Sequence, residues 1–203
     1  MEHTGALLRA LQGHEGGVMS CAFSGDGGQV VSAGDDGTVR LWDARTGELL
    51  RTLQGHEGWV RSCAYSGDGG QVVSAGQDGS VRLWDARTGE LLRTLQGHQG
   101  GVMSCAFSGD GGQVVSAGAD GTVRLWDART GELLRVTATS PHGHCVWTLS
   151  DNRIIEASGD AWRWMGWLDH DENGMPTRLP LEHFGLVPEP KPKRLMPPGV
   201  LAS

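Results

Sequence analysis

Short apolar runs separated by polar, glycine-rich stretches recur along the first two thirds of the chain. Between residues 13 and 54, four such runs occupy residues 18–23, 29–33, 38–42 and 48–53. The second and third runs are rich in β-branched residues, and the sequences SGDGG, DDG and RTG between the runs are typical of tight turns. The pattern therefore predicts a four-stranded antiparallel meander.

This 42-residue pattern occurs three times, in residues 13–54, 55–96 and 97–138. A four-stranded meander cannot bury both of its faces alone, and a repeat of about 40–45 residues is the length of one β-propeller blade. Residues 5–12 repeat the sequence of the fourth run, which predicts a leading outer strand. We therefore expect an all-β protein, with a β-propeller of four-stranded antiparallel blades over residues 5–187.

The remainder of the chain departs from the repeat. Residues 143–187 begin with Gly-His and contain the runs CVWTLS, RIIEAS and AWRWMGWL, which predicts one degenerate blade after the three regular ones. Residues 188–203 are rich in proline and include three basic side chains, which predicts an extended tail outside the propeller.

Three short motifs carry a resemblance to a known family. Each regular repeat has Gly-His at its start, Asp-Gly in its middle and Trp-Asp near its end, at fixed spacing. Over residues 5–138 this resembles the WD-repeat β-propeller family. The resemblance implies a non-enzymatic scaffold or sensor module that binds a protein or peptide through the top face of the ring. It also implies that the leading outer strand closes a ring by pairing with a last blade.

Each regular repeat also holds one His, one Ser, one Asp and one Trp at equivalent positions. Ser, His and Asp together suggest a hydrolase, but an active site would not occur three times in near-identical copies. The sequence VVSAG also lacks the first glycine of a nucleophile elbow. The family resemblance instead implies buried hydrogen-bonded structural tetrads. Their members are His14, Ser32, Asp36, Trp42, His56, Ser74, Asp78, Trp84, His98, Ser116, Asp120 and Trp126.

The three copies differ at few positions, and the non-conservative differences lie next to the Gly-His and Asp-Gly motifs. In the family these positions surround the central opening of the top face. Trp and Arg, which blade 2 carries there, are frequent in binding hot spots. The alternative is chance variation, with the Trp merely packed. We predict a partner-binding surface made of Gly17, Met19, Asp35, Trp59, Arg61, Gln77, Gly101, Met103 and Ala119.

Composition narrows the class of function. The net charge of −7 argues against a nucleic-acid partner, which needs a basic surface. We expect no signal peptide and no membrane partner, because the chain has no apolar run approaching 18 residues. Cys21, Cys63 and Cys105 stand at one repeat position, too far apart to form disulfides, which predicts a reducing, cytoplasmic location.

No cofactor or metal is expected. Residues 169–174 match the start of a calcium-binding loop, but Pro180 occupies the position of the final Glu ligand, so a turn is the preferred interpretation. One alternative function is a hydrolase-type or metal-dependent site in the atypical region 139–187. Its candidate residues are His142, His144, Asp169, Asp171 and His183.

Ring closure is the remaining question. Four blades per chain are few for this family, whose rings have about seven blades within the general range of four to eight. The first hypothesis is a homodimer that completes an eight-bladed ring. The second hypothesis is that one chain closes a ring alone. The third is that the ring is completed by blades on another chain. A purely structural assembly subunit is a further alternative function.

Overall fold

A computed structural model describes part of the chain as strands and turns. The residues described are 7–140, 143–148, 153–157, 167–170 and 176–179. The chain divides into two compact units, Met1–Trp162 and Arg163–Ser203, and each is considered by itself. In the described ranges, no helix is long and apolar enough to span a membrane.

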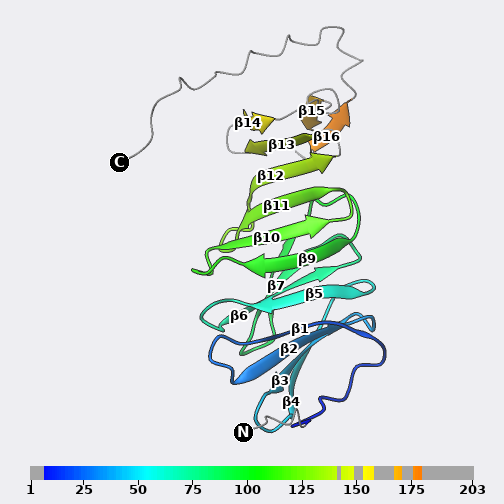
Figure 1. Cartoon of the computed structure of the whole chain (residues 1–203), viewed down its shortest axis with the longest axis vertical. Coiled ribbons are helices and arrows are strands. Elements are labelled where there is room, and N and C mark those ends of the chain that lie inside the picture. The colour runs from blue at the N-terminus through cyan, green and yellow to red at the C-terminus, as the bar shows by residue number, and fades with distance from the viewer. Residues whose placement is uncertain (1–6, 141–142, 149–152, 158–166, 171–175, 180–203) are drawn as a thin grey trace, which may run out of the picture. The chain divides into compact units, whose positions relative to one another are not determined.

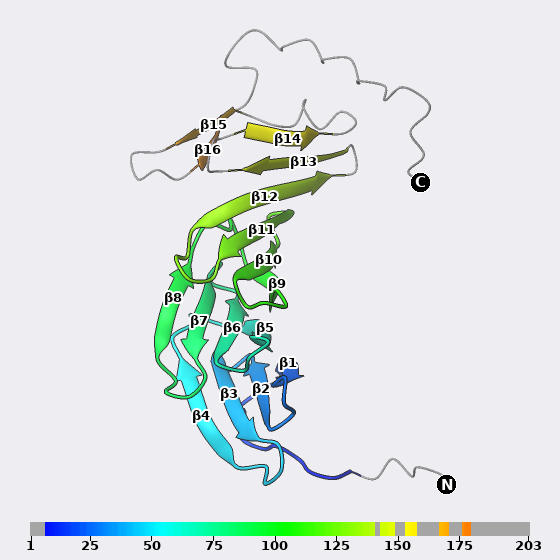
Figure 2. The same cartoon turned by 90° about the vertical axis from the view of Figure 1, so that its left-hand side faces the viewer.

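The first unit contains three antiparallel meanders, which we call blades 1, 2 and 3 (Figures 1 and 2). Blade 1 consists of β1 (Val18–Phe23), β2 (Gln29–Gly34), β3 (Thr38–Asp43) and β4 (Leu49–Gln54). Blade 2 consists of β5 (Val60–Tyr65), β6 (Gln71–Gly76), β7 (Val81–Asp85) and β8 (Leu91–Leu95). Blade 3 consists of β9 (Val102–Phe107), β10 (Gln113–Gly118), β11 (Thr122–Asp127) and β12 (Leu133–Ser140). The predicted four-stranded antiparallel units are confirmed.

The turn between β2 and β3 shows why the sequence folds locally in this way. The register pairs Ala33 with Val39, and the chain reverses over the Asp-Asp-Gly sequence between them. Gly37 has a φ of 77°, a conformation that favours glycine, and its amide donates to the Gly34 carbonyl at 3.3 Å. The Asp-Gly motif therefore fixes the hairpin and with it the register of the blade.

The fourth unit does not make a separate sheet in the first compact unit. β13 (Gly143–Thr148) pairs with β12, and β14 (Arg153–Ala157) pairs with β13, so blade 3 continues into a six-stranded sheet. The cause lies at position 139, where Thr replaces the glycine that follows β4 and β8 in the regular copies. A β-branched residue lets the strand continue into a new hairpin. A degenerate fourth blade is therefore not confirmed.

The second unit is described only as a hairpin of β15 (Trp167–His170) and β16 (Pro176–Leu179). The predicted tail, residues 188–203, lies outside the described residues.

The predicted leading outer strand is not formed in the described residues 7–12. Among the strands that the structure describes, none pairs with this segment. Its side chains nevertheless take an outer-strand position, because Arg9 and Leu11 approach Gly47 as Arg51 and Leu53 of β4 approach Gly89. The segment thus packs on blade 1 in the place where a preceding blade's outer strand would lie.

The hydrophobic core lies between blades, because β1 and β2 pack on β5, and β5 and β6 pack on β9. We call the face of a blade that packs on the next blade its trailing face, and the opposite one its leading face. The first core joins the trailing face of blade 1 (Val31, Ala33, Val39, Leu41, Leu53) to the leading face of blade 2 (Val60, Cys63, Tyr65, Val72, Trp84, Ala86). The second joins the equivalent residues of blades 2 and 3.

The blades approach so closely that backbone meets backbone. A Cβ added at Gly67 would lie 2.8 Å from the carbonyl oxygen of Gly109 in the next blade, and one at Gly25 would lie 2.7 Å from that of Gly67. A Cβ added at Gly109 would meet nothing within 4 Å. None of these three glycines has a positive φ, so contact rather than backbone strain decides the effect of a side chain.

We therefore predict that Gly67→Ala lowers the free energy of unfolding by about 1–3 kcal/mol, because the added methyl group overpacks the contact between blades 2 and 3. Gly109→Ala is the matched control and should stay within about 0.5 kcal/mol of the parent chain. Urea unfolding followed by tryptophan fluorescence, at a concentration where the chain is monomeric, measures both. Equal effects of the two variants would contradict the prediction.

Candidate functional site

The four recurring polar residues of each repeat meet in one hydrogen-bonded chain. In blade 2, the Trp84 indole N–H donates to Ser74 Oγ at 2.8 Å. Ser74 Oγ lies 2.8 Å from His56 Nε2, and His56 Nδ1 lies 3.0 Å from Asp78 Oδ2. With the imidazole proton on Nδ1, the Ser74 hydroxyl accepts from the indole and donates to His56 Nε2, and His56 Nδ1–H donates to the Asp78 carboxylate, so each of these four side chains has a partner.

Blades 1 and 3 repeat this geometry. The indole of Trp42 donates to Ser32 at 2.8 Å, and that of Trp126 donates to Ser116 at 2.9 Å. The imidazole–carboxylate contacts are 2.9 Å in blade 1 and 3.0 Å in blade 3. All twelve residues predicted as tetrads are thus brought together, four to a blade.

Two further residues join each network, and the sequence reasoning missed them. In blade 1, Asp36 accepts hydrogen bonds from the amide and the hydroxyl of Thr38 at 3.0 and 2.8 Å, and Arg40 Nη2 lies 3.5 Å from the same carboxylate. Ser80 and Arg82, and Thr122 and Arg124, do the same in the other blades. The signal was present in every copy as Asp-Gly-[Ser/Thr]-Val-Arg.

This arrangement is unsuited to nucleophilic catalysis. Ser74 is fully buried and Ser116 is 1% exposed, and each hydroxyl is engaged between an indole and an imidazole. A substrate carbonyl would have to reach a hydroxyl inside the sheet and displace both partners. The network instead ties the Gly-His loop to the Asp-Gly hairpin, because Asp78 also accepts from the Glu57 amide at 3.1 Å.

The tetrads perturb the protonation of their members. Burial raises the pKa of Asp120, but hydrogen bonds from the Gln99 amide and from Thr122 outweigh burial and bring that pKa to about 2. Burial lowers the pKa of His98 and of His56 below the usual 6.5, although the adjacent carboxylates act in the opposite direction. At neutral pH this favours a neutral imidazole beside an ionised carboxylate.

The variable positions lie side by side on the loops that the tetrads hold. The backbone amide of Gln77 donates to the carbonyl of Trp59 at 2.8 Å. The same bond joins Asp35 to Gly17, and Ala119 to Gly101, at 2.9 Å. Two positions that vary between copies are therefore neighbours in each blade, although 18 residues separate them in the sequence.

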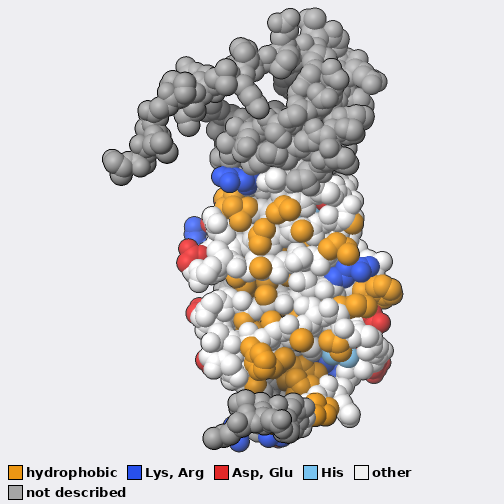
Figure 3. Space-filling view, viewed as in Figure 1, with side chains coloured by type: hydrophobic (Ala, Val, Ile, Leu, Met, Phe, Trp, Pro, Cys, Tyr) orange, Lys and Arg blue, Asp and Glu red, His pale blue; other side chains and the backbone are white. Residues whose placement is uncertain are grey.

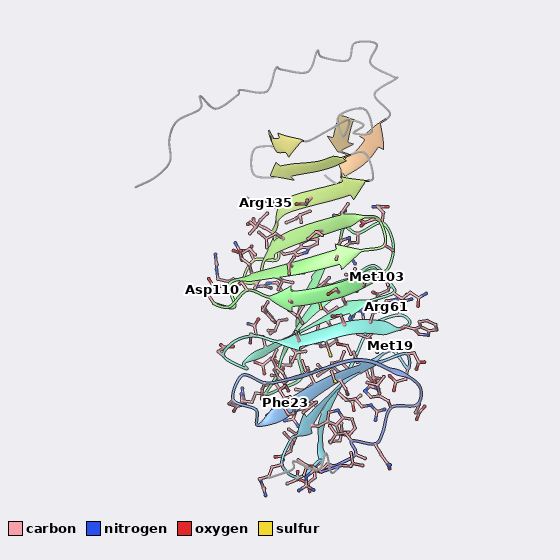
Figure 4. The ribbon with its side chains drawn as sticks, viewed as in Figure 1. Met19, Phe23, Arg61, Met103, Asp110 and Arg135 are labelled. Carbon is pink, nitrogen blue, oxygen red and sulfur yellow. The ribbon has the colours of Figure 1, made fainter. Side chains whose placement is uncertain are left out.

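Large side chains stand exposed at this end of the inner strands. Figure 4 shows Met19, Arg61 and Met103 along one side of β1, β5 and β9. Met19 is 42% exposed, Trp59 44% and Met103 49%. The Arg61 guanidinium lies 5.3 Å from the ring centre of Trp59, a cation–π distance. In the part of the chain that the structure describes, Arg61 Nε is buried without a hydrogen-bond partner.

The candidates for an enzymatic site in the atypical region are only partly placed. His144 lies on β13 of the first unit and Asp169 on β15 of the second. His142, Asp171 and His183 lie outside the described residues. Within the described ranges, no three His, Cys, Asp or Glu side chains form a group that could hold a metal ion.

Comparison with known proteins gives three matches. The model of the family described as "TEP-1 second beta-propeller" matches residues 2–161. The vegetative incompatibility protein HET-E-1 of Podospora anserina is 47% identical over 38 residues, which are 19% of this chain and 3% of that protein. The solved structure titled "Structure of U3-55K" superposes with a TM-score of 0.61 at 20% identity, over 72% of this chain and 53% of that one. The chain thus spans about half of that structure and a small part of HET-E-1.

The perturbed pKa values predict acid sensitivity. The imidazoles of His56 and His98 have lower pKa values in the folded chain than in the unfolded chain. As the pH falls below about 6.5, the unfolded chain therefore binds protons first, and the free energy of unfolding decreases. Stability decreases further below about pH 4, where unfolded Asp protonates before Asp120 does. Urea unfolding between pH 8 and pH 3 measures this. Unchanged stability from pH 8 to pH 5 would contradict the neutral, buried state of His56 and His98.

Proposed function

The chain belongs to the TEP-1 second β-propeller family of WD-repeat propellers, and from that premise we propose that it is a non-enzymatic scaffold or sensor module that binds a protein or peptide through the variable surface. We define the variable surface as Gly17, Met19, Asp35, Trp59, Arg61, Gln77, Gly101, Met103 and Ala119. WD-repeat propellers generally mediate protein–protein interactions. The use of this particular surface is our proposal.

One observation carries the proposal. The non-conservative differences between three near-identical copies meet at neighbouring positions that are exposed or half-buried, instead of being scattered over the surface. Hidden packing does not explain them, since Trp59 is 44% exposed, and Gly17 and Gly101 occupy its position in the other blades without loss of the blade. A shared binding surface is a selective reason for loops to diverge while the strands beneath them stay constant.

The chemistry of the surface indicates how a partner would be held. Trp59 offers a large, flat apolar surface, and Met19 and Met103 offer flexible apolar side chains that adapt to irregular shapes. Arg61 has no ion pair within the described residues, and its guanidinium can bind a carboxylate through two hydrogen bonds. We therefore propose a partner segment that combines an acidic side chain with apolar ones.

The absence of catalysis is also part of the proposal. It is supported by the tetrad serines, whose hydroxyls are buried and already engaged. We further propose a reducing, cytoplasmic setting. Burial raises the pKa of the thiols of Cys63 and Cys105 to about 12, which suits free, unreactive cysteines.

We propose in addition that two copies of the chain share one ring. The eight-bladed ring predicted from the sequence requires a fourth blade in each chain. The described residues instead form three complete blades and two strands that lengthen the third. The support for association is that blade 1 exposes large apolar side chains on its leading face, including Val18 and Phe23.

The copies themselves provide the variant that tests the binding surface. Trp59→Gly with Arg61→Met gives blade 2 the residues that blades 1 and 3 carry, so the fold should be retained. Peptides selected on the intact chain from a displayed library should bind this variant at least about tenfold more weakly, since Trp and Arg anchors contribute strongly to affinity. Ser80→Thr, another exchange between copies, is the control.

Isothermal titration with the selected peptides measures both variants. Equal affinity for the parent and the Trp59→Gly, Arg61→Met chain would contradict the proposal and favour a purely structural subunit.

A further inference from the structure

We infer that the leading face of blade 1 is a docking surface for the trailing face of blade 3 in a second copy of this chain. The contact would form a third hydrophobic core with the composition of the two cores inside the chain. The inference deepens the proposed association of two copies and is independent of the variable surface.

The inner-strand part of the leading face of blade 1, formed by β1, is an uncovered copy of two buried surfaces. Val18 is 55% exposed, whereas its equivalents Val60 and Val102 are fully buried. Phe23 is 68% exposed, whereas Tyr65 is 8% exposed. Figure 3 shows hydrophobic side chains gathered over β1 and β2, the region of this face. Blade 1 thus presents the residues that in blades 2 and 3 receive the preceding blade.

The trailing face of blade 3 is uncovered in the complementary way. Val115 is 37% exposed and Val123 is 40% exposed. Their equivalents in blade 1, Val31 and Val39, are fully buried against blade 2. Blade 1 therefore has an unpaired leading face and blade 3 has an unpaired trailing face. Faces of these two kinds already pack together twice within the chain, between blades 1 and 2 and between blades 2 and 3.

The polar contacts between blades fix the register of such docking. The Cys63 amide donates to Ser20 Oγ at 3.3 Å, and the Cys105 amide donates to Ser62 Oγ at 3.2 Å. In each case the inner strand of one blade supplies the serine and the next blade supplies the cysteine. The equivalent serine of blade 3, Ser104, and the equivalent cysteine of blade 1, Cys21, do not take part in either contact, and both are exposed. Docking would bring Ser104 of one copy to the Cys21 amide of the other.

A second hydrogen bond between neighbouring blades also repeats, from an arginine side chain of one blade to a backbone carbonyl of the next. Arg51 Nη2 donates to the Arg87 carbonyl of the next blade at 3.0 Å, and Arg93 Nε donates to the Arg129 carbonyl at 2.7 Å. Arg135 on β12 is the next member of this series and is exposed. Its acceptor in the docked pair would be the Arg45 carbonyl of the second copy.

The glycine contacts give the inference its sharpest consequence. Each interface inside the chain places a glycine of one blade, Gly25 or Gly67, against the carbonyl of the same position in the next blade. The third member of this series is Gly109, and among the described residues of one chain nothing lies within 4 Å of a Cβ added there. In the docked pair it would face the Gly25 carbonyl of the second copy, with no room for a methyl group.

The segment 7–12 occupies the place that β12 of the incoming copy needs. It forms no strand, and its Leu7 and Leu8 are 84% and 91% exposed, so its displacement breaks no strand hydrogen bonds and uncovers neither of these two leucines. β12 departs from the repeat at one core position, where Thr137 replaces the leucine represented by Leu53 and Leu95. Docking would displace segment 7–12 from blade 1 and place β12 there, with Thr137 at the repeat position that Leu11 occupies in one chain.

A contact between two different faces joins copies head to tail, and it ends in a closed ring only when the rotations add up. Two copies bring six complete blades, which is within the range of about four to eight found in propellers. Three copies would exceed that range. A closed pair is therefore the assembly that this contact favours.

The test compares absolute mass in solution for the intact chain and for Gly109→Ala. Light scattering on a sizing column should give about 43 kDa for the parent chain, twice its 21.6 kDa. Gly109→Ala should shift the population toward 21.6 kDa while its unfolding curve, measured at the concentration where both chains are monomeric, stays unchanged. A parent chain that remains at the single-chain mass at all concentrations overturns the inference, and so does a Gly109→Ala variant that pairs as tightly as the parent.

Two further variants separate this contact from the other proposals. Deleting residues 1–11 should leave or strengthen the pairing, because it removes the segment that β12 displaces. Loss of pairing would overturn the inference and indicate that the leading segment completes the other copy instead. Trp59→Gly with Arg61→Met should leave the mass unchanged, so a failure of the binding proposal is distinguishable from a failure of this one.

The thiol of Cys21 supplies an independent readout. Labelling by a maleimide should slow at least about tenfold on going from the monomeric to the paired concentration range, since docking buries Cys21 as Cys63 and Cys105 are buried. An unchanged rate in a chain shown to be paired would place the contact elsewhere and overturn the inference.

Discussion

The structure depends on one interaction above all, the packing of each blade's trailing face on the next blade's leading face. A four-stranded meander of this sequence has apolar side chains on both faces, and either face becomes a core only when a neighbour covers it. Val60 and Val102 are fully buried because β1 and β5 lie on them. Removal of apolar surface from water is the main favourable term in folding, at about 25 cal/mol per Å². Stability therefore belongs to pairs of blades more than to single blades, as in other repeat proteins.

Within each blade the tetrad does a different task. It gives each of its buried polar side chains a hydrogen-bond partner. It also joins the Gly-His loop to the Asp-Gly hairpin at the end of the inner strands. The Asp carries most of these contacts, since Asp36 accepts from His14, from the Glu15 amide and from Thr38. With the loop backbone held in this way, the side chains at positions 17, 19 and 35 and their equivalents are free to change without loss of the blade. A constant frame with variable loops is the arrangement expected of a binding module.

The repeat period made most of the fold predictable. Strands, turns and blades follow from a 42-residue pattern that occurs three times, and the tetrad residues could be chosen because they recur at fixed spacing. Prediction was weaker where the pattern changes. Thr139 in place of glycine continues β12 into a further hairpin with β13, where the repeat pattern predicts the first strand of a new blade. Residues 7–12 repeat an outer strand but have no edge to pair with. The exposure of Val18 and Phe23 depends on what covers them, and identical sequences in different blades do not carry that information.

The most direct test of this account compares three nearly identical strands within one molecule. Peptic peptides covering β1, β5 and β9 differ in mass through Glu15, Trp59 and Gln99, so their amide hydrogen exchange is resolved by mass spectrometry. At a concentration where the chain is monomeric, we expect fast exchange in β1 and slow exchange in β5 and β9, because only the latter two are covered by a preceding blade. Equal exchange in all three would contradict it, since each blade would then be stable without its neighbour.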